Sequence, residues 1–133
     1  MKCNQVFDIL RRKYVALTPE EGVRQHFIHY LIEQKGYPQH LLANEVKLQV
    51  GNKKLRCDTV LYSTELKPMM IIEYKAPHIE LTQQVFNQLL DYNSILNVEY
   101  LTMTNGTHTV CCRREKDKFH FLTDIPDYTD MIL

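Results

Sequence analysis

Acidic and basic residues alternate along two neighbouring segments of this chain. Arg56 and Asp58 lie two residues apart, and Glu73 and Lys75 repeat that spacing after a short polar stretch. Side chains point to alternate faces of a β-strand, so residues two apart share a face. If both segments are strands of one sheet, two carboxylates and two cations lie together. Such a set is suited to a hard divalent metal ion with an ammonium group beside it.

The two segments are predicted to form a β-hairpin. Residues 58–62 and 69–75 are rich in β-branched, aromatic and other apolar side chains, and the stretch between them is polar and ends in a proline. With a loop of residues 64–67, Ser63 pairs with Pro68, and pairing outward from there sets Asp58 opposite Glu73.

Two carboxylates that face each other across a ladder repel, because their Cβ atoms are only about 5 Å apart. We therefore expect a cation to neutralise Asp58 and Glu73. The alternative is a solvent-facing stripe of an antiparallel sheet, in which Asp58, Glu73, Lys75 and Arg56 simply pair with one another.

The composition is that of an ordinary globular protein. The 133 residues predict a single domain, 1–133, with an acidic tail at 123–133. Lys and Arg together number 16, as do Asp and Glu, so no overall field attracts nucleic acid. Basic residues nevertheless gather in three places, at Arg11, Arg12 and Lys13, at Lys53, Lys54 and Arg56, and at Arg113, Arg114, Lys116 and Lys118.

The cysteines and the hydropathy indicate a cytoplasmic protein. The four cysteines show no C-x-x-C spacing, and no signal peptide precedes them, so we expect reduced thiols. No apolar run approaches the ~20 residues of a membrane-spanning helix.

A helix is predicted from Pro19 to about Lys35. Thr18 is the expected N-cap, Pro19 occupies the first helical position, and Glu21 at the third completes a capping box. Gly36 and the following proline end the helix. The alternative role for Glu21 is that of an extra ligand to the metal or to its water.

The other elements follow from alternation and turn residues. Gln88 and Tyr92 are four residues apart on a second predicted helix, and the structural alternative for them is a surface amide over a half-buried tyrosine. The tail from Thr123 has no compensating base and is expected to be loosely ordered or to face a partner. Residues 1–17 suggest a short helix or strand on the core. The remaining predicted elements are strands 42–50, 53–62, 98–104, 107–113 and 119–122 and the helix 82–96.

The order of helix, three strands, helix and further strands (αβββαβ with extra C-terminal strands) predicts an α+β domain. Its central sheet is mixed or antiparallel and is flanked by a helix on each side. This order resembles the restriction-endonuclease-like superfamily, whose signature is written PD-(D/E)xK. Asp58 matches the aspartate of the second core strand, and Glu73-Tyr74-Lys75 matches the (D/E)xK of the third. Cys57 stands where many members have the proline.

Two further resemblances narrow the family. Gln88-x-x-x-Tyr92 resembles the Q-x-x-x-Y motif of the RecB-like branch. Residues 13–21, 72–77 and 104–106 are similar to the N-terminal domain of type I restriction enzyme R subunits, and the likeness runs from about residue 11 to residue 122. The chain has no G-x-x-x-x-G-K-[ST] phosphate-binding loop, so it is a free-standing relative or the nuclease module alone.

The resemblance implies a metal-dependent DNA endonuclease. Asp58 and Glu73 would hold one or two Mg²⁺ ions, or Mn²⁺, with the Tyr74 carbonyl as a further ligand, and Lys75 would orient the attacking water. Gln88 would position Lys75 or the substrate backbone. Accessory roles are implied for Tyr92, which would contact DNA, and for Arg56 and Glu21.

The implied partners are DNA, other subunits of a restriction system or a second copy of the chain. Two alternatives stay open. One is a nuclease fold that does not cut and serves as a DNA-binding or assembly module, and the other is a purely structural α+β domain.

Overall fold

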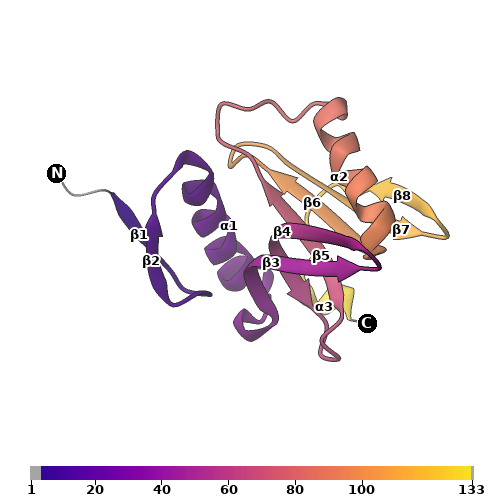
Figure 1. Ribbon diagram of the computed structural model, residues 1–133, viewed down its shortest axis with the longest axis horizontal. Helices are drawn as coiled ribbons and strands as arrows, with labels where there is room; N and C mark the ends of the chain where they lie inside the picture. Colours follow the sequence, from indigo (N-terminus) through magenta and orange to yellow (C-terminus); the bar gives the residue numbers. More distant parts are fainter. Residues whose placement is uncertain (1–3, 133) are drawn as a thin grey trace.

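The centre of the molecule is a mixed sheet of six strands in the order β3-β4-β5-β6-β7-β8 (Figure 1). The computed structural model describes residues 4–132, without the side chains of residues 92–96. Neighbouring strands are antiparallel except β5 and β6, which are parallel. The predicted α+β class with a mixed sheet is confirmed. The strands are β3 (Leu42–Val50), β4 (Lys53–Tyr62), β5 (Pro68–Tyr74), β6 (Tyr100–Thr104), β7 (Thr109–Glu115) and β8 (Lys118–Phe121).

The two long helices cover opposite faces of this sheet, as the sequence predicts. From α1 (Pro19–Lys35), Phe27 and Leu31 pack in one core cluster with Ile72 of β5. From α2 (Gln83–Leu96), Phe86 packs in a second cluster with Ile71, the next residue of β5. A short 3-10 helix, η1 (Gln39–Leu41), and the helix α3 (Tyr128–Met131) complete these elements.

The start of α1 only half matches the predicted capping box. The Thr18 hydroxyl accepts a hydrogen bond from the Glu21 N–H at 3.1 Å, so Thr18 is the N-cap. The Thr18 N–H, however, donates to the Ala16 carbonyl at 3.1 Å. The second bond of the predicted capping box, from the Thr18 N–H to the Glu21 carboxylate, is therefore wrong. The Glu21 carboxylate accepts hydrogen bonds from Arg11 and Arg24 instead. Gly36 ends the helix with φ of 72°, the left-handed conformation that favours glycine.

The N-terminal residues form a separate two-stranded sheet beside α1, the hairpin of β1 (Gln5–Asp8) and β2 (Lys13–Ala16) (Figure 1). The fully buried carboxylate of Asp8 accepts from the Leu10 N–H at 2.8 Å and from Asn44 of β3 at 2.9 Å. Burial alone would raise the pKa of Asp8, but hydrogen bonds from Arg11, Asn44 and two backbone N–H groups lower it to about 2.

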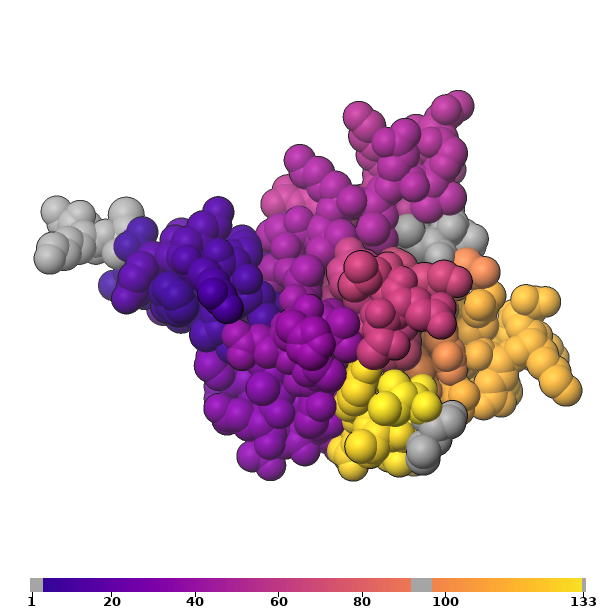
Figure 2. All heavy atoms as spheres, turned by 90° about the horizontal axis from the view of Figure 1, so that it is seen from below, coloured from indigo at the N-terminus to yellow at the C-terminus, as the bar shows by residue number. Residues whose placement is uncertain are grey.

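The C-terminal segment packs on the core (Figure 2, yellow). Ile125 and Met131 are buried within the α1-side cluster. Lys35, at the end of α1, pairs with Asp124 at 3.4 Å and with Asp127 at 3.5 Å. The expectation of loose order is wrong, because Ile125 and Met131 are buried and the tail's acidic residues find a base, Lys35, far away in the sequence.

The hairpin of β4 and β5 differs from the predicted one at its loop. Tyr62, not Ser63, pairs with Pro68, and a β-bulge follows between Leu61 and Tyr62. The bulge restores the predicted register, so Thr59 pairs with Ile72 as expected. The error in the loop therefore does not move the residues of the candidate site.

Candidate active site

Asp58 and Glu73 occupy the next positions along β4 and β5 after the pair Thr59–Ile72. Both side chains are half-buried. The Asp58 Oδ2 atom accepts a hydrogen bond from the Tyr74 N–H at 3.0 Å. This bond fixes the Asp58 carboxylate against the backbone that joins Glu73 to Lys75.

The environment of Glu73 opposes its ionisation. Burial is the main cause, and the charge of Asp58 adds to it, so the pKa of Glu73 is raised to about 8. The charge of Lys75 acts in the opposite direction with a smaller effect. As long as no metal ion is bound, Glu73 is therefore largely protonated at neutral pH, even with Lys75 nearby.

An open cavity of about 190 Å³ lies in front of these residues. Its lining includes Glu73 of β5, Lys75, which directly follows β5, and Gln88 of α2. The Lys75 N–H donates to the Thr104 carbonyl at 2.9 Å, which fixes the backbone here. Arg56 of β4 lines the same cavity, together with Leu89. The cavity thus gathers Glu73, Lys75, Gln88 and Arg56, with Asp58 interacting with Glu73 behind them.

The donor set fits one kind of metal site. Within residues 4–132, excluding the side chains at 92–96, no three His, Cys, Asp or Glu side chains come together to hold a metal ion. Asp58 and Glu73 supply two carboxylates. Mg²⁺ commonly binds to one or two carboxylates and keeps several waters or substrate phosphates. The site therefore fits a Mg²⁺ ion bound together with its substrate, and it does not fit a closed structural metal site.

Tyr74 has its side chain on the opposite face from the cavity. Its ring is buried in the α1-side cluster, packs against Phe27 with ring centroids 6.2 Å apart, and lies 5.8 Å from the guanidinium carbon of Arg24. Burial raises the pKa of its hydroxyl. Its N–H already positions Asp58, so Tyr74 connects the two faces of β5.

Glu21 lies outside the cavity. Its buried carboxylate accepts hydrogen bonds from Arg24 at 2.8 Å, Gln25 at 3.0 Å and Arg11 at 2.8 Å. Burial would raise the pKa of Glu21, but these donors outweigh burial and lower it. Tyr92, another predicted accessory residue, belongs to α2. Its side chain lies outside the described part of the chain, so its predicted role stays a prediction.

Sequence reasoning missed Arg24. Its Nη1 atom donates to the Asp58 carbonyl oxygen at 3.0 Å, and its Nη2 atom donates to Glu45 at 2.9 Å. Glu45 has φ of 55° and sits between the pairs Asn44–Thr59 and Val46–Cys57 of the β3–β4 ladder. Glu45 and Asp58, which lie opposite each other between these pairs, are not themselves paired, so the ladder is interrupted there. Arg24 holds the Asp58 backbone at this interruption. The only sequence signal was its spacing of three residues from Glu21, which places both on one side of α1.

The same interruption reverses the order in which β4 side chains alternate between the two faces of the sheet. Cys57 and Val60 are three residues apart and would lie on opposite faces of a regular strand, yet both pack in the α2-side cluster. The simple alternation of side chains therefore does not continue through Asp58. Burial first, and the carboxylates of Glu73 and Asp58 second, raise the pKa of the Cys57 thiol to about 12, so this cysteine is not a nucleophile at neutral pH.

A mixed sheet between two helices, with an aspartate on its second strand and Glu-x-Lys on its third, defines the restriction-endonuclease-like class. Comparison with known families identifies the branch. The family described as type I restriction enzyme R protein N terminus (HSDR_N) matches residues 19–126, and the chain belongs to this family.

A solved structure has the same fold. It is a fragment of a protein assigned as an HsdR subunit of a type I restriction enzyme from Vibrio vulnificus YJ016. The superposition has a TM-score of 0.62 at 16% sequence identity, and it covers 87% of this chain and 25% of that one. This chain therefore spans about a quarter of the length of that relative. A search of the curated proteins finds no match.

In the part of the chain that the structure describes, no helix is both long and apolar enough to cross a membrane.

Proposed function

We propose that this domain is a metal-dependent DNA endonuclease of the kind found at the N terminus of type I restriction R subunits. The observation that carries the proposal is the position of Asp58 and Glu73 on adjacent strands, with Lys75 in the same open cavity as Glu73. The family match supports the nuclease kind.

Each residue then has a defined task. Asp58 and Glu73 would hold Mg²⁺, and the Tyr74 N–H orients the Asp58 carboxylate. A bound Mg²⁺ ion lowers the pKa of its water and stabilises charge on a phosphodiester. The Lys75 ammonium would hold that water or a phosphate oxygen in place, and Gln88 lies across the cavity, where it would contact the substrate backbone.

The direct test is cleavage of supercoiled plasmid in Mg²⁺ by the wild type and by Lys75→Ala. We expect the rate to fall by on the order of 100-fold or more, the typical effect of removing one group that stabilises transition-state charge. Lys67→Ala is the matched control, since this lysine is 80% exposed in the loop of the same hairpin. Asp58→Ala and Glu73→Ala should also abolish cleavage. Equal rates in chelator and in Mg²⁺ would overturn the proposal.

A second candidate is a DNA-binding or assembly module that does not cut alone. It is favoured by the exposed basic residues Lys47, Lys53, Lys54 and Arg56 on β3 and β4, which suit a nucleic-acid backbone whether or not that backbone is cut. This candidate predicts salt-dependent DNA binding, no cleavage with any divalent metal, and no effect of Lys75→Ala beyond binding. Other subunits of a restriction system would then be its partners.

A further inference from the structure

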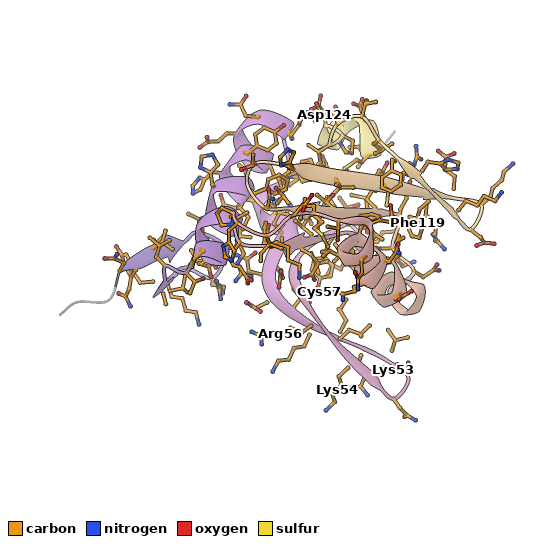
Figure 3. All side chains as sticks on the ribbon, turned by 90° about the horizontal axis from the view of Figure 1, so that it is seen from above. Lys53, Lys54, Arg56, Cys57, Phe119 and Asp124 are labelled. Carbon is orange, nitrogen blue, oxygen red and sulfur yellow. The ribbon has the colours of Figure 1, made fainter. Side chains whose placement is uncertain are left out.

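A strongly basic hairpin extends from the candidate site. We call residues 46–57, at the outer ends of β3 and β4, the basic arm. The arm contains four basic residues and no acidic one, although basic and acidic residues balance at 16 each in the whole chain. Figure 3 shows Lys53 and Lys54 at its tip, away from the body, with Arg56 nearer to it. In Figure 2 the arm is the magenta protrusion.

The basic residues of the arm are presented outward. Lys47 pairs directly with Arg56, and Gln49 pairs with Lys54, so these side chains lie on one side of the hairpin. All four are exposed. On the other side, Leu55 is buried, which keeps the arm from being a loose extension. Three of the four charges, those of Lys47, Lys54 and Arg56, therefore lie on one side of the arm, and Lys53, which pairs with Val50, lies on the other.

Arg56 joins the arm to the cavity. It lines the cavity with Glu73 and Lys75, and its Nε atom donates to Glu45 at 2.8 Å. Lys54 lies four residues from Asp58, or roughly 13 Å at about 3.3 Å per residue. Phosphates of one DNA strand follow one another at about 3.4 Å along the helix axis. If a DNA strand that is cut in the cavity runs along β4, it would thus pass Lys54 at about the fourth phosphate from the cut.

The composition of the arm favours a duplex. Proteins that bind single strands stack the bases on aromatic side chains. Residues 46–57 include no aromatic side chain, so the arm offers only charge and polar groups to a backbone. Contacts of this kind position a duplex without reading its sequence.

We propose that the basic arm binds the phosphate backbone of duplex DNA beside the cut site and so sets where the strand lies in the cavity. This inference rests on the proposed function for the choice of DNA. It assigns Lys53 and Lys54 as positioning residues, outside the catalytic group of Asp58, Glu73 and Lys75.

The test is the salt dependence of binding to a fluorescent DNA duplex, measured by anisotropy in chelator, where nothing is cut. In Lys53→Gln/Lys54→Gln we expect the slope of log affinity against log salt to be smaller by about 2, and affinity at about 50 mM salt to fall at least about tenfold. Lys116→Gln/Lys118→Gln is the matched control. It removes two lysines from the β7–β8 hairpin, where Glu115 and Asp117 lie beside them, and should bind like the wild type.

Four results would overturn the inference. They are an unchanged slope in the arm variant, an equal loss in the control variant, tighter binding to a single strand or to an RNA duplex of the same sequence, and no binding of the duplex by the wild type. The outcome is separate from catalysis. If the arm variant has a reduced salt slope but the wild type shows no Mg²⁺-dependent cleavage, the result supports DNA binding by the arm and contradicts the endonuclease. If the wild type cleaves and the slope of the arm variant is unchanged, the result supports the endonuclease and contradicts the role of the arm.

Discussion

At the scale of single residues, the site depends on a carboxyl group that is buried beside another. Glu73 cannot ionise freely because burial and Asp58 both oppose its charge. Lys75 does not cancel these effects. A divalent cation would do so, and this is the physical reason to read the pair as a metal site.

The first prediction concerns the pH dependence of stability in chelator. The pKa of Glu73 is about 8 in the folded protein, against an ordinary value of 4.5. Between these values the folded state holds a proton that the unfolded state has released, so stability should fall as the pH rises from 4.5 to 8. Glu73→Gln should remove this loss, on the order of 2 kcal/mol once solvent screening is allowed for. Thermal melts of both proteins across this range check it, and parallel pH profiles would contradict it.

The second prediction concerns Arg24, which is 8% exposed and bonded to Glu21, Glu45 and the Asp58 carbonyl. Arg24→Met leaves buried acceptors without their donor, so we expect a loss of about 3 kcal/mol in denaturant unfolding. Arg56→Gln is the control. Its side chain is 67% exposed beside the same Glu45, so the expected loss is below about 1 kcal/mol. Equal losses in the two variants would refute the supporting role of Arg24.

At the scale of elements, the sequence predicts best where local signals agree. The bounds of α1 follow from Thr18 and Gly36, and those of β3 and β4 follow from alternation around the turn at residues 51–52. The strands β1 and β2 have only four residues each, too few for a clear period. The bulge at Leu61 and Tyr62 carries no local sequence signal, because it depends on pairing with β5.

The third prediction is that Asp8 anchors the β1–β2 hairpin. Its carboxylate bonds to Arg11 within the hairpin connection and to Asn44 of β3. Asp8→Ala should destabilise the protein by about 3 kcal/mol and speed amide hydrogen exchange in residues 5–16 more than elsewhere. Glu65→Ala, at a carboxylate that is 76% exposed, is the control and should change neither. Uniform exchange across the chain of Asp8→Ala would show that the hairpin is not a separate unit.

At the scale of the whole molecule, the candidate site was predictable in part. Pairing outward from the predicted loop placed Asp58 opposite Glu73, although the loop pairing itself was wrong and a bulge offset the error. The spacing of Glu73 and Lys75 correctly put both at one cavity. The contacts of Arg24 with Asp58 and of Asp8 with Asn44 span 34 and 36 residues and depend on how α1 and the first hairpin pack. The spacing of apolar residues in the sequence does not predict contacts of this kind. The basic arm, by contrast, is visible in the sequence as the cluster of Lys53, Lys54 and Arg56, although the total charge is neutral.

The central claim is that Asp58 and Glu73 share a divalent cation, and thermal melts of the wild type and Asp58→Asn, in chelator and in Mn²⁺, test it most directly. Asparagine keeps an oxygen that can accept from the Tyr74 N–H, so the variant removes mainly charge. Above about pH 8, where Glu73 is ionised as well, we expect Asp58→Asn to be more stable than the wild type in chelator by about 1 kcal/mol, because one of two facing charges is gone. Mn²⁺ should stabilise the wild type by mass action and the variant very little. If Asp58→Asn melts below the wild type in chelator and Mn²⁺ shifts neither protein, the pair is a structural stripe of charges and the nuclease site is wrong.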